Sequence, residues 1–177
     1  AQGHVRIDFK DALLDVASDL VGYDVREDYD WFKTAIVGVM RNGNGFISGL
    51  TYSWNVEAVH NHPQIMTGRR LLQRLGTEVF RKIDPDYWVQ RYMERIAPSM
   101  EAGNNIVTAD CRFRNEVEAI VRVAGSRLVF CDYRSSRYNA SLDHESEKVA
   151  QLLLRSGFKD GQEITQEEFC VVLEEEK

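Results

Sequence analysis

The apolar positions of this chain follow strand-like and helix-like periods in turn, which predicts alternating β and α elements. Residues 5–7 form a short segment typical of a strand, with Val5 and Ile7 as its apolar positions. Helical spacing follows Asp8, which is expected to cap the helix, and continues to Gly22. Beyond it we expect a helix over 30–40, a turn at 42–45, an extended segment over 46–54 and a loop at 60–64.

The middle of the chain predicts two longer helices. Thr67 is a candidate N-cap for a helix whose apolar side carries leucine and valine and whose opposite side carries arginine. Asp84 and Pro85 then open a second helix, and Pro98 is expected to end it. Its buried stripe is predicted to consist of Trp88, Tyr92 and Ile96.

A strand–helix–strand pattern follows, with strands over 105–110 and 127–133 around a helix over 114–124. A right-handed crossover would make these strands parallel and end them at one edge, where Asp110, Arg112 and Arg134 should converge. Helices are also predicted over 145–156 and after the capping-box pair Thr165 and Glu168. The fold class is therefore α/β, a parallel sheet flanked by helices, in a single domain over 1–177.

Composition and charge argue against several classes of protein. The chain has 177 residues, is 44% hydrophobic, and has no stretch near the roughly 20 apolar residues of a membrane span. Its net charge of −6 argues against general nucleic-acid binding. The odd count of 3 cysteines argues against a disulfide framework and favours a reducing cytoplasm. The sequence leaves the oligomeric state open, including a homodimer.

Asp110 and Arg112 stand where the strand over 105–110 ends, and ligands bind at such edges of open α/β sheets. Asp110 could hold Mg²⁺ through a water, accept a proton, or simply cap the following helix. Arg112 favours phosphate binding, because a guanidinium matches phosphate oxygens bidentately. Asn115 and Glu116 lie in the first helical turn, where Glu116 suits the helix dipole and is expected to brace Arg112 or an arginine of the 69–74 cluster.

A second cluster lies on the predicted helix after Thr67. Arg69, Arg70, Gln73 and Thr77 occupy adjoining faces, which suits a ligand with a phosphate at one end and a base at the other. A solvated helix face is the alternative. Gly76 costs a helix about 1 kcal/mol relative to alanine, which indicates a close backbone approach or a helix end.

Two further segments carry weaker signals. The polar residues over 134–147 predict either a surface loop or a lid over a phosphate site. His60 and His62 make a weak metal pair, because no third ligand stands at a fixed spacing.

Taken in order, these motifs resemble the deoxynucleoside monophosphate kinases of tailed bacteriophages over roughly residues 5–150. The matching elements are Phe9-Lys10-Asp11-Ala12-Leu13, Arg69-Arg70-Leu71-Leu72-Gln73-Arg74-Leu75-Gly76-Thr77-Glu78, Tyr87-Trp88, Asp110-x-Arg112-x-x-Asn115-Glu116, Gly125, Arg134 and His144-x-Ser146-Glu147.

The resemblance implies a P-loop kinase fold that transfers the γ-phosphoryl of ATP, with Mg²⁺, to a deoxynucleoside monophosphate in the cytoplasm, that of the host if the chain is viral. It further implies roles for the site residues. Asp110, Arg112 and Arg134 would be catalytic. Arg69, Arg70, Gln73, Thr77, Asn115 and Glu116 would bind substrate, and Arg137, His144 and Glu147 would belong to a lid over 134–147.

The chain departs from the family pattern in two places. It contains no Gly-x-x-x-x-Gly-Lys-Ser/Thr, the motif that cradles ATP phosphates. Since the chain begins at Ala1 rather than methionine, we expect an N-terminal truncation that removed the first strand–loop–helix. The residues after about Lys148 could not be matched to the family's final strand and helix.

Two alternatives stay open at this point. One is a kinase-derived protein that binds nucleotide or a partner without turnover. The other is a metal-dependent nuclease or hydrolase that uses Asp110, Glu116 and another acid. The hydrolase leaves the 69–73 cluster without a role. An in-frame P-loop in the upstream coding sequence would favour the kinase over the binding protein.

Overall fold

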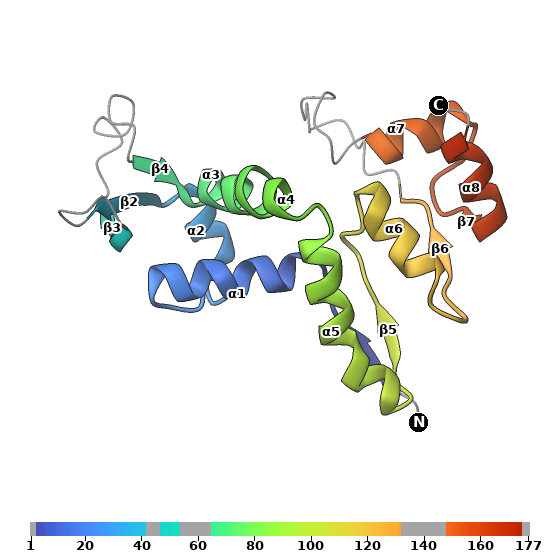
Figure 1. Ribbon diagram of the computed structural model, residues 1–177, viewed down its shortest axis with the longest axis horizontal. Helices are drawn as coiled ribbons and strands as arrows, with labels where there is room; N and C mark the ends of the chain where they lie inside the picture. Colours follow the sequence, from blue (N-terminus) through green and yellow to red (C-terminus); the bar gives the residue numbers. More distant parts are fainter. Residues whose placement is uncertain (1–2, 42–46, 54–64, 132–147, 175–177) are drawn as a thin grey trace. The chain divides into compact units, whose positions relative to one another are not determined.

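The computed structural model describes residues 3–41, 47–53, 65–131 and 148–174, and it divides into two compact units, Ala1–Ala109 and Asp110–Lys177 (Figure 1). Each unit is treated by itself below. Together they give a helix-rich α/β chain with a small parallel sheet. That the whole chain forms a single domain stays a prediction.

The parallel sheet of the first unit joins the two ends of that unit. Strand β1 (His4–Arg6) pairs with β5 (Asn105–Val107), with Val5 opposite Ile106. The backbone N–H of Ile7 extends the ladder by donating to the carbonyl of Val107 at 3.1 Å. Residues separated by about a hundred positions are thereby fixed side by side.

Helix α1 (Lys10–Val21) follows β1 and ends at Gly22, whose φ of 79° is the left-handed conformation that glycine adopts without strain. The prediction that Asp8 caps this helix was wrong. Phe9 occupies the N-cap position without a side-chain cap, and the Asp8 carboxylate is bound elsewhere.

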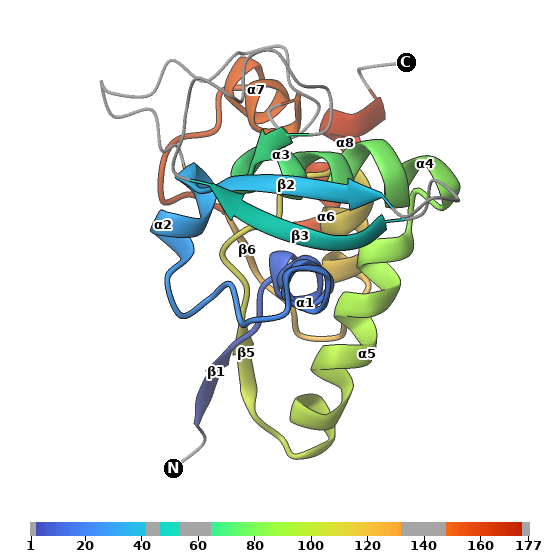
Figure 2. The same ribbon diagram turned by 90° about the vertical axis from the view of Figure 1, so that its left-hand side faces the viewer.

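The predicted helix over 30–40 is corrected by the structure. Helix α2 (Tyr29–Thr34) is capped by Asp28, and strand β2 (Ile36–Arg41) begins two residues after it ends. β2 is the middle strand of an antiparallel sheet, between β3 (Ile47–Ser53) and β4 (Ile65–Thr67), and Figure 2 shows β2 and β3 side by side. The β-branched residues Ile36, Val37 and Val39 favour a strand once neighbouring strands are available.

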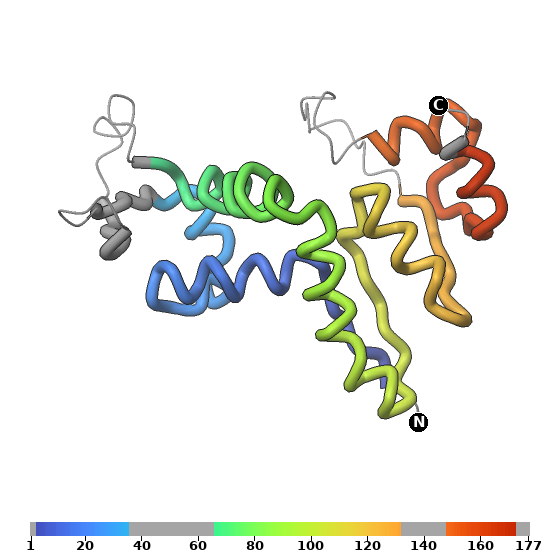
Figure 3. Tube along the Cα trace, viewed as in Figure 1, coloured from blue at the N-terminus to red at the C-terminus, as the bar shows by residue number. Residues whose placement is uncertain are grey.

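A continuous helical run follows β4, traced in Figure 3, but it is not the single α-helix that was predicted. It consists of α3 (Gly68–Gln73), the π-helix η2 (Arg74–Val79) and α4 (Phe80–Ile83). The Thr67 hydroxyl accepts from the Arg70 N–H at 3.2 Å, which confirms the predicted cap. Leu71 and Leu72 pack in a core with other buried side chains, Leu14, Ala17, Val25 and Phe32.

Helix α5 (Tyr87–Glu101) buries the predicted stripe of Trp88, Tyr92 and Ile96. Pro98 does not end this helix, which continues for three more residues. Proline lacks the N–H that would donate to the carbonyl four residues earlier, so the last turn of α5 forms without that one hydrogen bond.

The second unit contains α6 (Arg114–Val121), β6 (Leu128–Val129), α7 (Lys148–Arg155), β7 (Glu163–Ile164) and α8 (Gln166–Glu174). Its core consists of Val117, Phe130, Leu153, Ile164, Phe169 and Val172. The capping box before α8 is confirmed, because Thr165 and Glu168 each accept a hydrogen bond from the other's backbone N–H.

The predicted pairing of strands 105–110 and 127–133 in one parallel sheet is not found in the described residues. β5 pairs with β1, whereas β6 pairs antiparallel with β7, so the two strands belong to separate sheets. Both are also shorter than predicted, and β6 has only two residues. Among the helices that the structure describes, none combines the length and the apolar character needed to cross a membrane.

Candidate functional site

The buried carboxylate of Asp8 lies at the carboxyl end of β1. The sequence predicted only a helix-capping role for this residue. Asp8 is 4% exposed. Its Oδ1 accepts from the backbone N–H of Ala109 at 2.9 Å, and its Oδ2 lies 2.9 Å from Nε of Arg6 and 3.4 Å from Nζ of Lys10. Asp8 therefore ties the end of β1 to the residue that precedes Asp110.

Burial opposes ionisation of this carboxyl group and would by itself raise its pKa. The Ala109 N–H, the hydrogen bond from Arg6, and the positive charges of Lys10 and Arg6 together outweigh burial, so the pKa of Asp8 lies below its ordinary value. The alternation Arg6-x-Asp8-x-Lys10 was the available sequence signal. It places a carboxylate between two cations at a strand end.

Asp8→Asn is expected to reduce stability in a pH-dependent way. A lowered pKa in the folded state stabilises the fold above the unfolded-state pKa, and this contribution is lost as the pH falls from 3.8 toward the folded-state value. At pH 7 we expect a loss of about 1 kcal/mol, because Arg6 and Lys10 are partly exposed. Urea unfolding at several pH values measures it.

The difference between Asp8→Asn and the unsubstituted protein should shrink as the pH falls below 3.8. Asp30→Asn is the matched control, because Asp30 is 92% exposed in its pair with Lys33 and should contribute little. If Asp8→Asn lowers the free energy of unfolding by the same amount at low pH, the ionised carboxylate is not what stabilises the fold.

The predicted nucleotide-binding residues of the first unit share the run of α3 and η2. The side chains of Arg69, Arg70 and Gln73 are exposed, and Thr77 is half-buried. Glu78 contacts two arginines of this run, with Oε1 2.9 Å from Nη2 of Arg70 and Oε2 3.4 Å from Nε of Arg74. The run thus presents guanidinium groups, a carboxamide and a hydroxyl.

The backbone at Gly76 is closely approached by other helices, one of the two explanations that the sequence offered for a glycine within a helix. Its carbonyl accepts a hydrogen bond from Nε1 of Trp88 at 2.8 Å, and a Cβ at this position would lie 3.3 Å from Cδ2 of Leu13. Leu13 of α1 therefore leaves little room for a side chain at position 76.

The predicted catalytic residues of the second unit lie on the loop that enters α6. Glu116 is 2% exposed, and its Oε2 accepts the backbone N–H groups of Arg112 at 2.9 Å and Phe113 at 3.0 Å. Glu116 thus braces Arg112 through the main chain, at the positive end of the helix dipole. The Arg112 side chain is exposed, and Asp110 and Asn115 are half-buried.

Cys111 lies between the two candidate catalytic residues, in surroundings that disfavour its thiolate form. Burial raises the pKa of its thiol, and the negative charges of Glu116 and Asp110 raise it further. The reactive thiolate is therefore scarce near neutral pH.

The structure brings the predicted site residues together in two groups, Arg69 to Thr77 in the first unit and Asp110 to Glu116 in the second. Arg134, Arg137, His144 and Glu147, like His60 and His62, lie outside the described residues. The convergence of Asp110 and Arg112 with Arg134 therefore stays a prediction.

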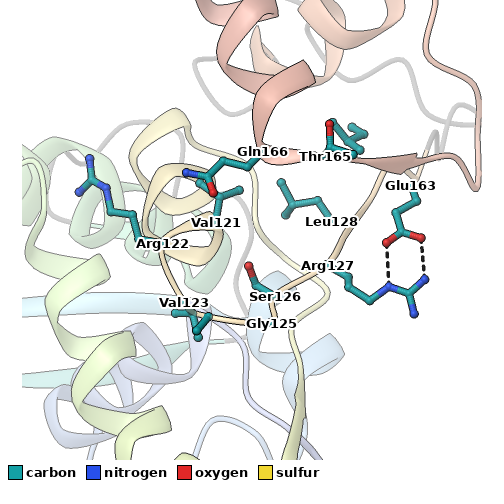
Figure 4. A pocket seen from close by; sticks show the side chains of 12 residues that line it. Val121, Arg122, Val123, Gly125, Ser126, Arg127, Leu128, Glu163, Thr165 and Gln166 are labelled. Carbon is teal, nitrogen blue, oxygen red and sulfur yellow. Dashed lines mark hydrogen bonds and ion pairs between the residues drawn. The ribbon is translucent and has the colours of Figure 1, made fainter.

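Two hollows, one in each unit, are lined by other residues. The larger, about 590 Å³, lies at the carboxyl end of α6, next to the ion pair of Arg127 and Glu163 (Figure 4). The other, about 530 Å³, lies beside Asp15, Asp24 and Arg26. Within the described ranges, no group of three or more His, Cys, Asp or Glu side chains could enclose a metal ion.

Comparison with known proteins gives one match. The family described as deoxynucleotide monophosphate kinase matches residues 19–153, which is more than half of the chain and includes both groups of candidate residues. No curated protein matches, and no solved structure matches.

Proposed function

We propose that this chain, which belongs to the deoxynucleotide monophosphate kinase family, binds a deoxynucleoside monophosphate as the acceptor of the γ-phosphoryl group of ATP. The observation that carries the proposal is the family match over residues 19–153, because it includes the arginine-rich run of α3 and η2 and the loop from Asp110 to Glu116. Phosphoryl transfer depends mainly on positioning and on neutralising charge, and both groups supply side chains suited to that.

The α3–η2 run would hold the acceptor. Arg69 and Arg70 would donate to the monophosphate, since guanidinium groups match phosphate oxygens in pairs of hydrogen bonds. Gln73 lies one helical turn from both, and its carboxamide would pair with the edge of the base through one donor and one acceptor. The hydroxyl of Thr77 would add a further polar contact.

The loop before α6 would serve the transferring group. Asp110 and Arg112 would stand at the phosphates, with Arg134 as a further cation, while Glu116 holds the Arg112 main chain and Asn115 contacts the substrate. Arg137, His144 and Glu147 would belong to a lid over 134–147. Arg112 would act directly on the reaction, because its guanidinium would neutralise negative charge on the transferring phosphoryl group.

A Mg²⁺ ion would be held by Asp110 through water. Mg²⁺ in nucleotide kinases keeps several waters and uses one or two carboxylates together with substrate phosphates, so a single half-buried Asp110 fits such an ion without an all-protein cage. When bound, it neutralises charge on the phosphates. The sequence contains no Gly-x-x-x-x-Gly-Lys-Ser/Thr, so none of its residues is assigned to a P-loop cradle for the ATP phosphates.

That same sequence observation favours one second candidate, a kinase-derived protein that binds a nucleotide or a partner without turnover. The two candidates share the acceptor site and differ in phosphoryl transfer. An assay of the complete gene product with ATP, Mg²⁺ and each of dAMP, dCMP, dGMP and dTMP separates them. Diphosphate formation supports the kinase, and binding without product supports the second candidate. If no monophosphate binds, the kinase is wrong, and so is the second candidate as a nucleotide-binding protein.

Gln73→Ala is expected to change base preference more than maximal rate. Loss of one paired hydrogen-bonding group costs about 1–3 kcal/mol for the favoured base, whereas the phosphate contacts remain. The measurement is kcat/KM for the four monophosphates, before and after substitution. An unchanged preference profile would contradict the role assigned to Gln73.

A further inference from the structure

The π-helix within the α3–η2–α4 run changes which side chains share a face. In η2 the backbone N–H of Phe80 donates to the carbonyl of Leu75, five residues earlier, in place of the four of an α-helix. In a regular α-helix, residues seven apart share a face and residues eight apart diverge by about 80°. One additional residue in the turn moves position 78 back toward the face of Arg70.

The turn is held by packing with other helices. The indole of Trp88 is 3% exposed and donates to the carbonyl of Gly76 in the middle of η2. On the other side, Leu13 of α1 leaves little room for a side chain at position 76. Residues of α1 and α5 therefore both contact the wider turn at Gly76.

The result of this geometry is an ion pair between residues eight positions apart. Nη2 of Arg70 lies 2.9 Å from Oε1 of Glu78, and the other carboxylate oxygen faces Nε of Arg74 at 3.4 Å. Arg70 stays 54% exposed. A guanidinium carries five N–H donors, so one contact with Glu78 leaves donors available for an anion.

We infer that Glu78 is a positioning residue for acceptor binding: its carboxylate, brought to the face of Arg70 by η2, holds that guanidinium for the phosphate of a deoxynucleoside monophosphate. Arg70 is a long side chain, and holding it in one geometry before binding removes part of the entropy that the ligand would otherwise have to overcome. The inference rests on the proposed function, because it takes Arg70 as a phosphate contact.

The test is calorimetric titration of the full chain with dAMP, dCMP, dGMP and dTMP, and with inorganic phosphate as a base-free probe. Glu78→Gln keeps the size of the side chain and removes its charge, and we expect Kd for the monophosphates to rise about threefold to fivefold. The matched control is Glu94→Gln on α5, whose carboxylate pairs with Arg91 at 2.9 Å, and it should leave Kd unchanged.

A double-mutant cycle separates positioning from a general structural effect. In an Arg70→Ala background, Glu78→Gln should produce no further loss of affinity, because the guanidinium that it holds is gone. The thermal unfolding midpoints of Glu78→Gln and Glu94→Gln should agree with each other. Glu78→Asp should recover part of the affinity.

The failures are distinguishable. If Arg70→Ala weakens binding but Glu78→Gln leaves it unchanged, or tightens it by removing a competing anion, the inference is wrong and the proposed function stands. If Arg70→Ala has no effect, or if the unsubstituted chain binds no monophosphate, then the acceptor site itself is wrong and the inference falls with it.

Discussion

Arg112→Ala is expected to lower kcat of the complete gene product by about 100-fold to 1000-fold while the fold survives. Removing one preorganised donor from a transition state that carries developing charge has effects of this size. The fold should tolerate the change, because the side chain is exposed and Arg112 contacts Glu116 through its backbone N–H, which alanine retains. Turnover with ATP, Mg²⁺ and the preferred monophosphate measures it.

The control is Arg114→Ala, two residues along the same loop–helix junction. Arg114 pairs with Glu118 at 2.8 Å across one exposed turn of α6, so its loss should change kcat by less than about twofold. Equal thermal midpoints for the two variants would show that any difference in turnover is chemical. Near-normal turnover in Arg112→Ala would remove this side chain from the mechanism.

Gly68→Ala is expected to destabilise the first unit by about 3 kcal/mol. A Cβ at this position would overlap the backbone carbonyl oxygen of Phe32, and a backbone atom cannot move away as a flexible side chain can. The backbone of Gly68 is also fixed, since its N–H donates to the carbonyl of Ala35 at 2.9 Å. Helix propensity alone predicts the opposite sign, because alanine is about 1 kcal/mol better than glycine in a helix.

Urea unfolding of Gly68→Ala is best compared with Gly3→Ala. A Cβ at position 3 would lie 4.0 Å from the side chain of Asn104, which is ordinary contact, so stability should change little there. A neutral or stabilising effect at Gly68 would show that α2 and α3 do not pack as closely as the structure indicates.

The elements that could be predicted from the sequence are those decided by nearby residues. The stripe Trp88, Tyr92 and Ile96 repeats at helical spacing, so burial of one face follows directly from the pattern. The Thr67 cap and the Thr165–Glu168 capping box each depend on groups three residues apart. These features formed where they were expected.

The elements that could not be predicted depend on distant partners. The sequence predicted residues 36–40 to be the end of a helix, but hydrogen bonding with β3 and β4 makes them a strand. Asp8 serves Ala109, a partner 101 residues away, so its short-range reading as a helix cap was wrong. The carbonyl of Gly76 in the π-turn accepts a hydrogen bond from Trp88, 12 residues away, while β5 and β6 pair with β1 and β7 rather than with each other.

Some features of the candidate site could likewise be proposed from the sequence, and one could not. The two groups of candidate residues around Arg70 and Arg112 could be proposed from the sequence because each lies within about ten residues and carries a distinct chemistry. Glu78 escaped notice as a partner of Arg70, since eight residues is not a contact spacing in a regular helix.

The extra residue in η2 also limits how the gene can change. A single-codon deletion between Arg74 and Val79 would let the run close into an uninterrupted α-helix, and the faces on either side would keep their relative direction, because the wide turn is what accommodates the extra residue. A second deletion would have no wide turn to absorb it, and it would rotate one side of the run by about 100° relative to the other. The loss of one codon within η2 should accordingly be tolerated better than the loss of two.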